Sequence, residues 1–209
     1  MLYPRTAGWS LGFLLLLPLT AAAQDTFTPQ HVAKLRIVTE AVISPDGTQV
    51  AYVLAVPRDL TKEKDGGSWT ELHVVDTKGN STPFITGQVN VGSIAWTPDG
   101  KQIVVANFRS NNVSIVDVDM AIAKKPGAEV ARIPLVRSDK DAARPKGVAV
   151  TADGHYAVVA GGNNTIKASA TNLTGTAFVI DLQKKTLAAT VTGVGIDPYG
   201  VAILDKAGK

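Results

Sequence analysis

The chain has 209 residues, with 21 lysines and arginines against 18 aspartates and glutamates, which gives a net charge of +3. Hydrophobic residues make up 45% of the chain and charged residues 19%, so a core can form and wholesale disorder is excluded. The near balance of charges gives no reason to expect nucleic acid as a partner. The chain contains no cysteine, which excludes disulfides, thiolate metal sites, covalently attached haem and cysteine nucleophiles.

The segment 1–23 has the three parts of a secretory signal peptide. Arg5 supplies the positive charge, residues 9–19 are apolar, and Ala21–Ala23 is a small-residue cleavage site. We therefore expect a mature chain that begins near Gln24 and is periplasmic or secreted. The apolar stretch is shorter than the ~20 residues that cross a bilayer, so we expect no stable membrane insertion.

Residues 24–39 lead into the fold and contain a short predicted helix. Thr28 suits the N-cap position of this helix, and Pro29 suits its first turn. We expect the helix to pack on the rest of the protein as a plug or lid.

From residue 40 onward the sequence repeats. Asp-Gly turns occupy residues 44–47, 97–100 and 151–154, and residues 205–208 resemble them. The closing glycines stand at positions 47, 100, 154 and 208, so the length of the repeat is nearly constant. Each turn stands between two apolar runs, which is a strong hairpin signal.

Each repeat predicts four short strands. The first strand precedes the Asp-Gly turn, the second follows it, the third ends in aspartate, and the fourth comes after that aspartate. The first strands are 40–43, 92–96, 147–150 and 200–204; the second are 49–55, 102–108 and 155–160; the third are 72–76, 113–117 and 177–181; the fourth are 82–86, 129–136 and 186–192.

Four short antiparallel strands in a repeat of roughly 40–54 residues are typical of a β-propeller blade. The predicted fold is therefore all-β, a partial propeller over residues 40–209. Its blades span about 40–91, 92–146 and 147–199, and 200–209 begins a fourth. The repeated aspartates are interpreted as turn and strand caps rather than as a metal site or a catalytic set.

The first half of the chain carries one family resemblance, on the helix at 28–35 and the runs 41–53, 69–76 and 83–86. These runs resemble the N-terminal propeller of the prolyl oligopeptidase family of serine peptidases and the related TolB-like repeats. In that family the propeller filters access to an active site on a separate α/β-hydrolase domain. Since no G-x-S-x-G motif follows residue 23, no catalytic residue carries over to this chain.

The second half carries another resemblance, on the runs 104–107, 112–117, 145–150 and 198–202. These runs resemble YVTN-type propeller repeats, which implies an exported protein of the lactonase-like or haem-linked kind. Only three histidines are available as haem ligands, and we interpret those in the strand and the turn as inert. No cofactor and no metal are expected.

Three blades are fewer than the roughly four to eight that close a propeller ring. The chain is therefore a remnant of a longer protein, half of a homodimer that completes a six-bladed ring, or a genuine short composite product. The sequence leaves all three interpretations open.

Binding is expected on the face that carries the long loops between second and third strands and between blades. Basic side chains on these loops predict a protein partner or a small anionic ligand. The candidate ligand-binding residues are Arg109, Arg144, Lys146, Asn163, Asn164, Asp197 and Tyr199. The main hypothesis is an exported binding scaffold without catalytic machinery. The alternatives are the propeller part of a prolyl oligopeptidase-like peptidase and a lactonase-like YVTN protein.

Overall fold

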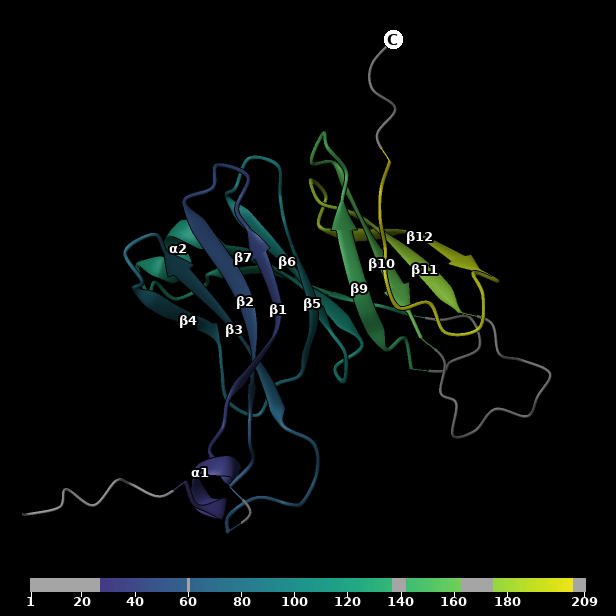
Figure 1. Cartoon of the computed structure of the whole chain (residues 1–209). Helices are drawn as coiled ribbons and strands as arrows, with labels where there is room; N and C mark the ends of the chain where they lie inside the picture. Colours follow the sequence, from purple (N-terminus) through teal and green to yellow (C-terminus); the bar gives the residue numbers. More distant parts are fainter. Residues whose placement is uncertain (1–26, 60, 137–141, 163–174, 205–209) are drawn as a thin grey trace, which may run out of the picture.

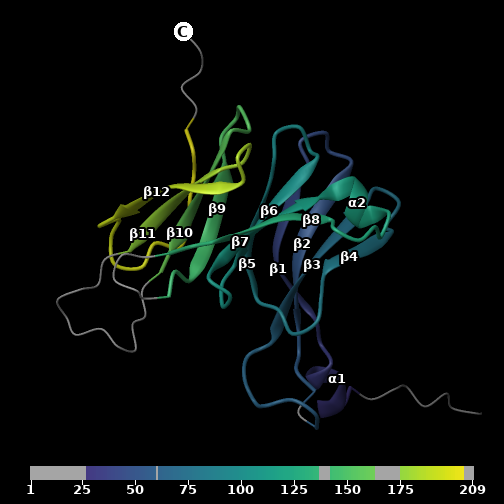
Figure 2. The ribbon, with the colours of Figure 1, turned by 180° about the vertical axis from the view of Figure 1, so that it is seen from behind.

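The computed structural model describes residues 27–59, 61–136, 142–162 and 175–204. Within these ranges the chain forms three separate four-stranded antiparallel sheets, in the strand orders β1-β2-β3-β4, β5-β6-β7-β8 and β9-β10-β11-β12. Each sheet is a simple meander, and the three stand side by side (Figures 1 and 2). The prediction of an all-β fold built from three propeller blades is confirmed.

The strands follow the predicted runs closely. Blade 1 holds β1 (Ile37–Ile43), β2 (Gln49–Val56), β3 (Trp69–Asp76) and β4 (Ser81–Ile85); blade 2 holds β5 (Val91–Trp96), β6 (Gln102–Asn107), β7 (Asn112–Asp117) and β8 (Glu129–Pro134); blade 3 holds β9 (Pro145–Val150), β10 (Tyr156–Gly161), β11 (Thr176–Asp181) and β12 (Thr186–Thr192). A short helix that the sequence analysis did not predict, α2 (Val118–Ile122), joins β7 to β8.

The Asp-Gly turns of all three blades share two hydrogen bonds to the aspartate, one from a hydroxyl two residues before it and one from the backbone N–H two residues after it. In blade 1, Asp46 accepts from the hydroxyl of Ser44 at 2.6 Å, and from the backbone N–H and the hydroxyl of Thr48. These bonds lower the pKa of Asp46 to about 2. Asp99 and Asp153 repeat the bond to the preceding threonine hydroxyl, at 2.6 and 2.5 Å. The aspartates therefore act as turn caps, as predicted.

Apolar side chains pack between neighbouring blades. One cluster lies between blades 1 and 2 and includes Val53, Leu72, Ile103 and Val105. The other lies between blades 2 and 3 and is centred on Phe178, which is fully buried. Since successive residues of a strand point to opposite faces of the sheet, blade 2 contributes to both clusters with alternating residues of the same strand.

The innermost strands approach one another so closely that their backbones touch. A Cβ atom on Gly92 of β5 would lie 2.8 Å from the carbonyl oxygen of Pro145 in β9. A Cβ atom on Gly147 of β9 would meet the carbonyl oxygen of Tyr199. Glycine at these places lets each blade begin against the backbone of the next.

We predict that Gly92→Ala destabilises the protein by about 1–3 kcal/mol, because the added methyl meets a backbone oxygen that cannot rotate away. The thermal midpoint should fall by roughly 2–4 °C for each kcal/mol, as measured by differential scanning calorimetry. Gly67→Ala is the matched control, since a Cβ at Gly67 meets nothing within 4 Å. An equal drop in both variants would contradict the close-approach argument.

The leading helix does not act as the expected plug. Helix α1 (Pro29–Ala33) begins after Thr28 as predicted, but it lies beyond the end of the blade 1 sheet (Figure 1). The apolar residues Phe27, Val32 and Leu35 are each more than half exposed. The expectation that this helix packs on the propeller was therefore wrong. Neither helix in the described ranges is long and apolar enough to cross a membrane.

The predicted first strand of a fourth blade, residues 200–204, is not a strand in the structure. The chain nevertheless runs next to β9 there, because the backbone of Tyr199 and Gly200 touches Gly147. The segment thus stands beside the innermost strand of blade 3 without the ladder hydrogen bonds that a second strand would supply.

Candidate functional site

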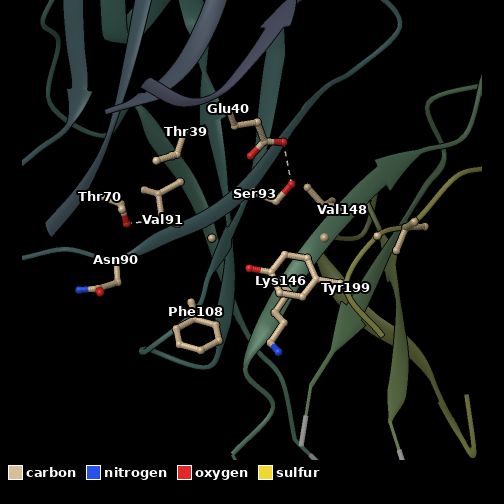
Figure 3. A pocket seen from close by; sticks show the side chains of 14 residues that line it. Thr39, Glu40, Thr70, Asn90, Val91, Ser93, Phe108, Lys146, Val148 and Tyr199 are labelled. Carbon is tan, nitrogen blue, oxygen red and sulfur yellow. Dashed lines mark hydrogen bonds between the residues drawn. The ribbon is translucent and has the colours of Figure 1, made fainter. Parts of the chain in front are cut away.

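A cleft of about 690 Å³ lies where the innermost strands of the three blades meet. Its walls come from β1, β5 and β9, and the segment Tyr199–Val201 closes one side (Figure 3). These strands are neighbours because consecutive blades pack face to face, so every repeat contributes to the cleft. The sequence predicted binding on the loop face; of its candidate residues, Lys146 and Tyr199 line this cleft, whereas the strand residues of β1 and β5 were not among them.

Glu40 is the acidic residue of the cleft. It lies on β1 and accepts a hydrogen bond of 2.9 Å from the hydroxyl of Ser93 on β5, across the boundary between blades 1 and 2 (Figure 3). Burial raises the pKa of Glu40, although hydrogen bonds from Ser93 and the backbone of Ile94 act against this rise. Its carboxylate forms no ion pair with any residue in the described part of the chain.

Three of the predicted site residues come together at the opposite wall. The ammonium group of Lys146 on β9 forms an ion pair of 2.6 Å with Asp197, and its nitrogen lies 4.9 Å from the centre of the Tyr199 ring. The side chain of Lys146 is only 14% exposed. The charge of Lys146 is therefore already balanced by Asp197 and by the face of an aromatic ring.

Two further predicted residues, Arg109 and Arg144, line a separate cleft of about 430 Å³ with Asn111 and Ala142. The side chain of Asn111 accepts from the backbone N–H of Arg144 at 2.9 Å, which ties the loop between β6 and β7 to the start of blade 3. Phe108 lines both this cleft and the larger one. Asn163 and Asn164 lie outside the described residues.

The loop between β2 and β3 forms a compact unit on the same end of blade 1 as helix α1 (Figure 1). The guanidinium of Arg58 lies 3.9 Å from the centre of the Trp69 ring and donates to the carbonyl oxygens of Lys64 and Gly67. The indole N–H of Trp69 donates to Glu63 at 3.0 Å. Arg58 therefore serves to order this loop.

Among the described residues no group of three or more histidines, aspartates or glutamates has the arrangement of a metal site. His73 lies within β3, where it is 3.1 Å from Glu71 and stacks on the ring of Tyr52. His155 follows the tight turn of blade 3, and its backbone N–H donates to Asp153. Both histidines lie in the strand and turn positions that the sequence predicted.

A signal for Glu40 is present in the repeat pattern of the sequence. Counted back from the closing glycine of each turn, at 47, 100 and 154, Glu40 corresponds to Ser93 and Gly147. At this position of the first strand, blade 1 therefore has a carboxylate where blade 2 has a hydroxyl and blade 3 has a hydrogen. A charged residue in the middle of an apolar strand is the feature that could have indicated the site.

Comparisons with known proteins match the fold alone. No family model matches the sequence, and no curated protein matches it. Among solved structures, 378 chains match, which indicates a widespread architecture.

One of these structures is an acylaminoacyl peptidase from Pyrococcus horikoshii, with a TM-score of 0.52 and 12% identity over 78% of this chain and 26% of the peptidase. A eukaryotic initiation factor matches with a TM-score of 0.50 and 11% identity over 80% of this chain and 34% of the factor. The β-propeller domain of the trilobed protease from Pyrococcus furiosus matches with a TM-score of 0.44 and 14% identity over 76% of this chain and 43% of that domain.

The three meandering sheets and the likeness to the acylaminoacyl peptidase define the class: the chain is a β-propeller. More particularly, its blades resemble the propeller domains of peptidases of the prolyl oligopeptidase family, as the first half of the sequence predicted. The chain spans about a quarter of the acylaminoacyl peptidase that it matches.

We predict that Glu40→Gln stabilises the protein at pH 7. The pKa of Glu40 is raised in the folded state, so its ionised form is disfavoured by folding, and stability is lost as the pH rises from about 4.5 through the folded pKa. The gain in free energy of unfolding from Glu40→Gln should therefore be larger at pH 7 than at pH 4, as measured by urea denaturation.

Glu129 supplies the matched control for this experiment. It also accepts from a serine hydroxyl, that of Ser114, but it forms an ion pair of 2.7 Å with Arg132. Burial raises the pKa of Glu129, yet the bonds from Arg132 and Ser114 outweigh burial and hold it below its ordinary value. Glu129→Gln should thus lower stability at pH 7. Destabilisation of similar size in both variants would refute the assignment of Glu40 as an uncompensated carboxylate.

Proposed function

We propose that the chain is an exported β-propeller that binds a protein segment or a small ligand and has no catalytic machinery of its own. The observation that carries this proposal is the cleft at the meeting point of β1, β5 and β9. Its volume of about 690 Å³ lies within the roughly 300–1,000 Å³ range of ligand sites in proteins. The strands that line it belong to packed sheets, so the cleft is preformed.

Chemistry at the cleft supports binding rather than reaction. Two charged residues line it, Glu40 and Lys146, and they stand on different blades. The ammonium nitrogen of Lys146 forms an ion pair with Asp197 at 2.6 Å, so Lys146 is not available as a base or nucleophile. Arg109 lines the adjoining cleft and provides positive charge for an anionic group of the same ligand or partner.

This proposal predicts where a ligand perturbs the protein. Gly92, Gly147 and Gly200 line the cleft, whereas Gly47, Gly100 and Gly154 close the turns between the first and second strands. Glycine amide signals occupy their own region of a ¹H–¹⁵N spectrum. Titration with a mixture of short unstructured peptides should shift the signals of the first set and leave those of the second set unchanged.

The peptide mixture is the probe, and buffer with the free amino acids is its control. Shifts confined to the turn glycines, or no shift at millimolar peptide, would remove the cleft as the binding site. Loss of the shifts in the Tyr199→Ala variant would place the contact at Tyr199, a residue that is 73% exposed and lines the cleft.

A second candidate function is favoured by the structural likeness to the acylaminoacyl peptidase. In that interpretation the chain forms part of the propeller of a prolyl oligopeptidase-like peptidase, and the cleft is part of the route by which substrate reaches a hydrolase domain. The likeness covers 26% of the peptidase chain, so this interpretation needs a larger native protein.

The two candidates differ in the size of the native protein. Antibodies raised against the chain should detect, in the exporting cells, a species below the 21.9 kDa of the full sequence if the binding scaffold is the native product. A band several times heavier, with serine-hydrolase labelling by a fluorophosphonate probe, is the result expected for the peptidase. The lactonase-like alternative predicts lactone hydrolysis by the purified chain itself.

A further inference from the structure

The cleft between the innermost strands carries one charge without a counter-charge. Of the two charged side chains that line it, Lys146 is paired with Asp197 at 2.6 Å. Among the described residues, the hydrogen-bond donors to Glu40 are both neutral: the Ser93 hydroxyl and the backbone of Ile94. Since an ionised carboxylate that is partly removed from water is costly unless it is paired, the cleft is prepared for a positive group that the described residues do not supply.

The surroundings of Glu40 define the shape of that group. The hydroxyl of Ser93 donates to Oε1 of Glu40, so its own lone pairs stay available as acceptors. The hydroxyl of Thr39 donates to the carbonyl oxygen of Val53, which leaves acceptor capacity on Thr39 as well. A tetrahedral ammonium has three donors, and a carboxylate with one or two hydroxyl oxygens beside it meets that need.

A guanidinium fits the same position less well. Its planar fork prefers two free carboxylate oxygens for a bidentate contact. One oxygen of Glu40 is already occupied by the Ser93 hydroxyl at 2.9 Å. The apolar side chains of Val91 and Val148 and the ring of Phe108 line other parts of the cleft, where an aliphatic stem can lie (Figure 3).

We propose that the cleft binds a primary ammonium group of a peptide, held by the carboxylate of Glu40 with the hydroxyls of Ser93 and Thr39. The inference rests on the proposed function of this cleft as a binding site. The ammonium comes from a lysine side chain or from the amino terminus of a peptide, and both sources share this chemistry.

The test uses the full chain and isothermal titration with matched small probes. Nα-acetyl-lysine amide carries the side-chain ammonium, and Nα-acetyl-norleucine amide replaces it with a methyl group. Nα-acetyl-arginine amide carries the guanidinium. Glycyl-alanine amide and its acetylated form test the amino terminus as the source. We expect the ammonium probe of the correct source to bind at least about tenfold more tightly than its neutral partner.

Two variants separate the charge from the fold. Glu40→Gln keeps the size of the side chain and an acceptor for Ser93 but removes the charge, so the preference for the ammonium probe should disappear. Glu129→Gln, a carboxylate outside the cleft that also accepts from a serine hydroxyl, should leave the preference unchanged. Circular dichroism of both variants checks that the sheets are intact.

The outcomes distinguish this inference from the proposed function. If neutral and charged probes bind equally, or Glu40→Gln retains the preference, the cleft is a binding site but Glu40 does not select an ammonium group. If the guanidinium probe is preferred, the assignment of an ammonium is wrong. If no probe binds at all and the peptide mixture causes no shift in the cleft glycines, both the inference and the proposed function fall.

Discussion

The middle sheet of this chain, blade 2, is buried on both faces, and each face is covered by a neighbouring sheet. Along β6, for example, Ile103 and Val105 belong to the cluster with blade 1, while Val104 and Ala106 belong to the cluster with blade 3. Because side chains alternate along a strand, this one short apolar strand packs against both blade 1 and blade 3. Because the length of the repeat is nearly constant, every blade carries such an apolar strand at the same position. Sheets stacked in this way bring their first strands together, and the cleft lies between those strands.

The same alternation makes the two ends of the stack unequal. Val104 of blade 2 faces blade 3. The residue at the same position of the repeat in blade 3 is Val158, and its side of the sheet faces away from the other blades. At the other end, Tyr52 corresponds to Val105 but carries a hydroxyl that bonds to Ser81 at 2.7 Å. His73 beside it pairs with Glu71. The outer face of blade 1 is therefore equipped with satisfied polar groups, as a terminal repeat needs, while that of blade 3 is apolar.

The sequence was sufficient for features that arise from short-range chemistry. The turn around Asp46 needs only residues 44–48, so the repeated motif predicted it and the flanking strands. Lys146 and Asp197 were both named, but their ion pair joins residues 51 positions apart and depends on how the chain returns to blade 3. The position of helix α1 was predicted correctly and its packing was not, since Phe27, Val32 and Leu35 are each more than half exposed. Glu40 was not predicted as a site residue, because its role depends on its contact with Ser93 in the next blade.

This difference between the outer faces of blades 1 and 3 bears on one of the three interpretations of the sequence, the six-bladed ring completed by two copies. In such a ring blade 1 of one copy would cover blade 3 of the other, and the Glu71–His73 pair would be buried against an apolar face, at a cost in desolvation. The segment from Tyr199 to Leu204 adds a steric condition. Its backbone already touches Gly147, at the place where β1 of a second copy would have to begin. A second copy can cover blade 3 only if this segment moves aside or becomes a strand of the incoming sheet. A partner that adds strands to this segment would avoid both the burial of the Glu71–His73 pair and the steric conflict at Gly147. It would leave the outer face of blade 1 in water and keep residues 199–201 in the wall of the cleft.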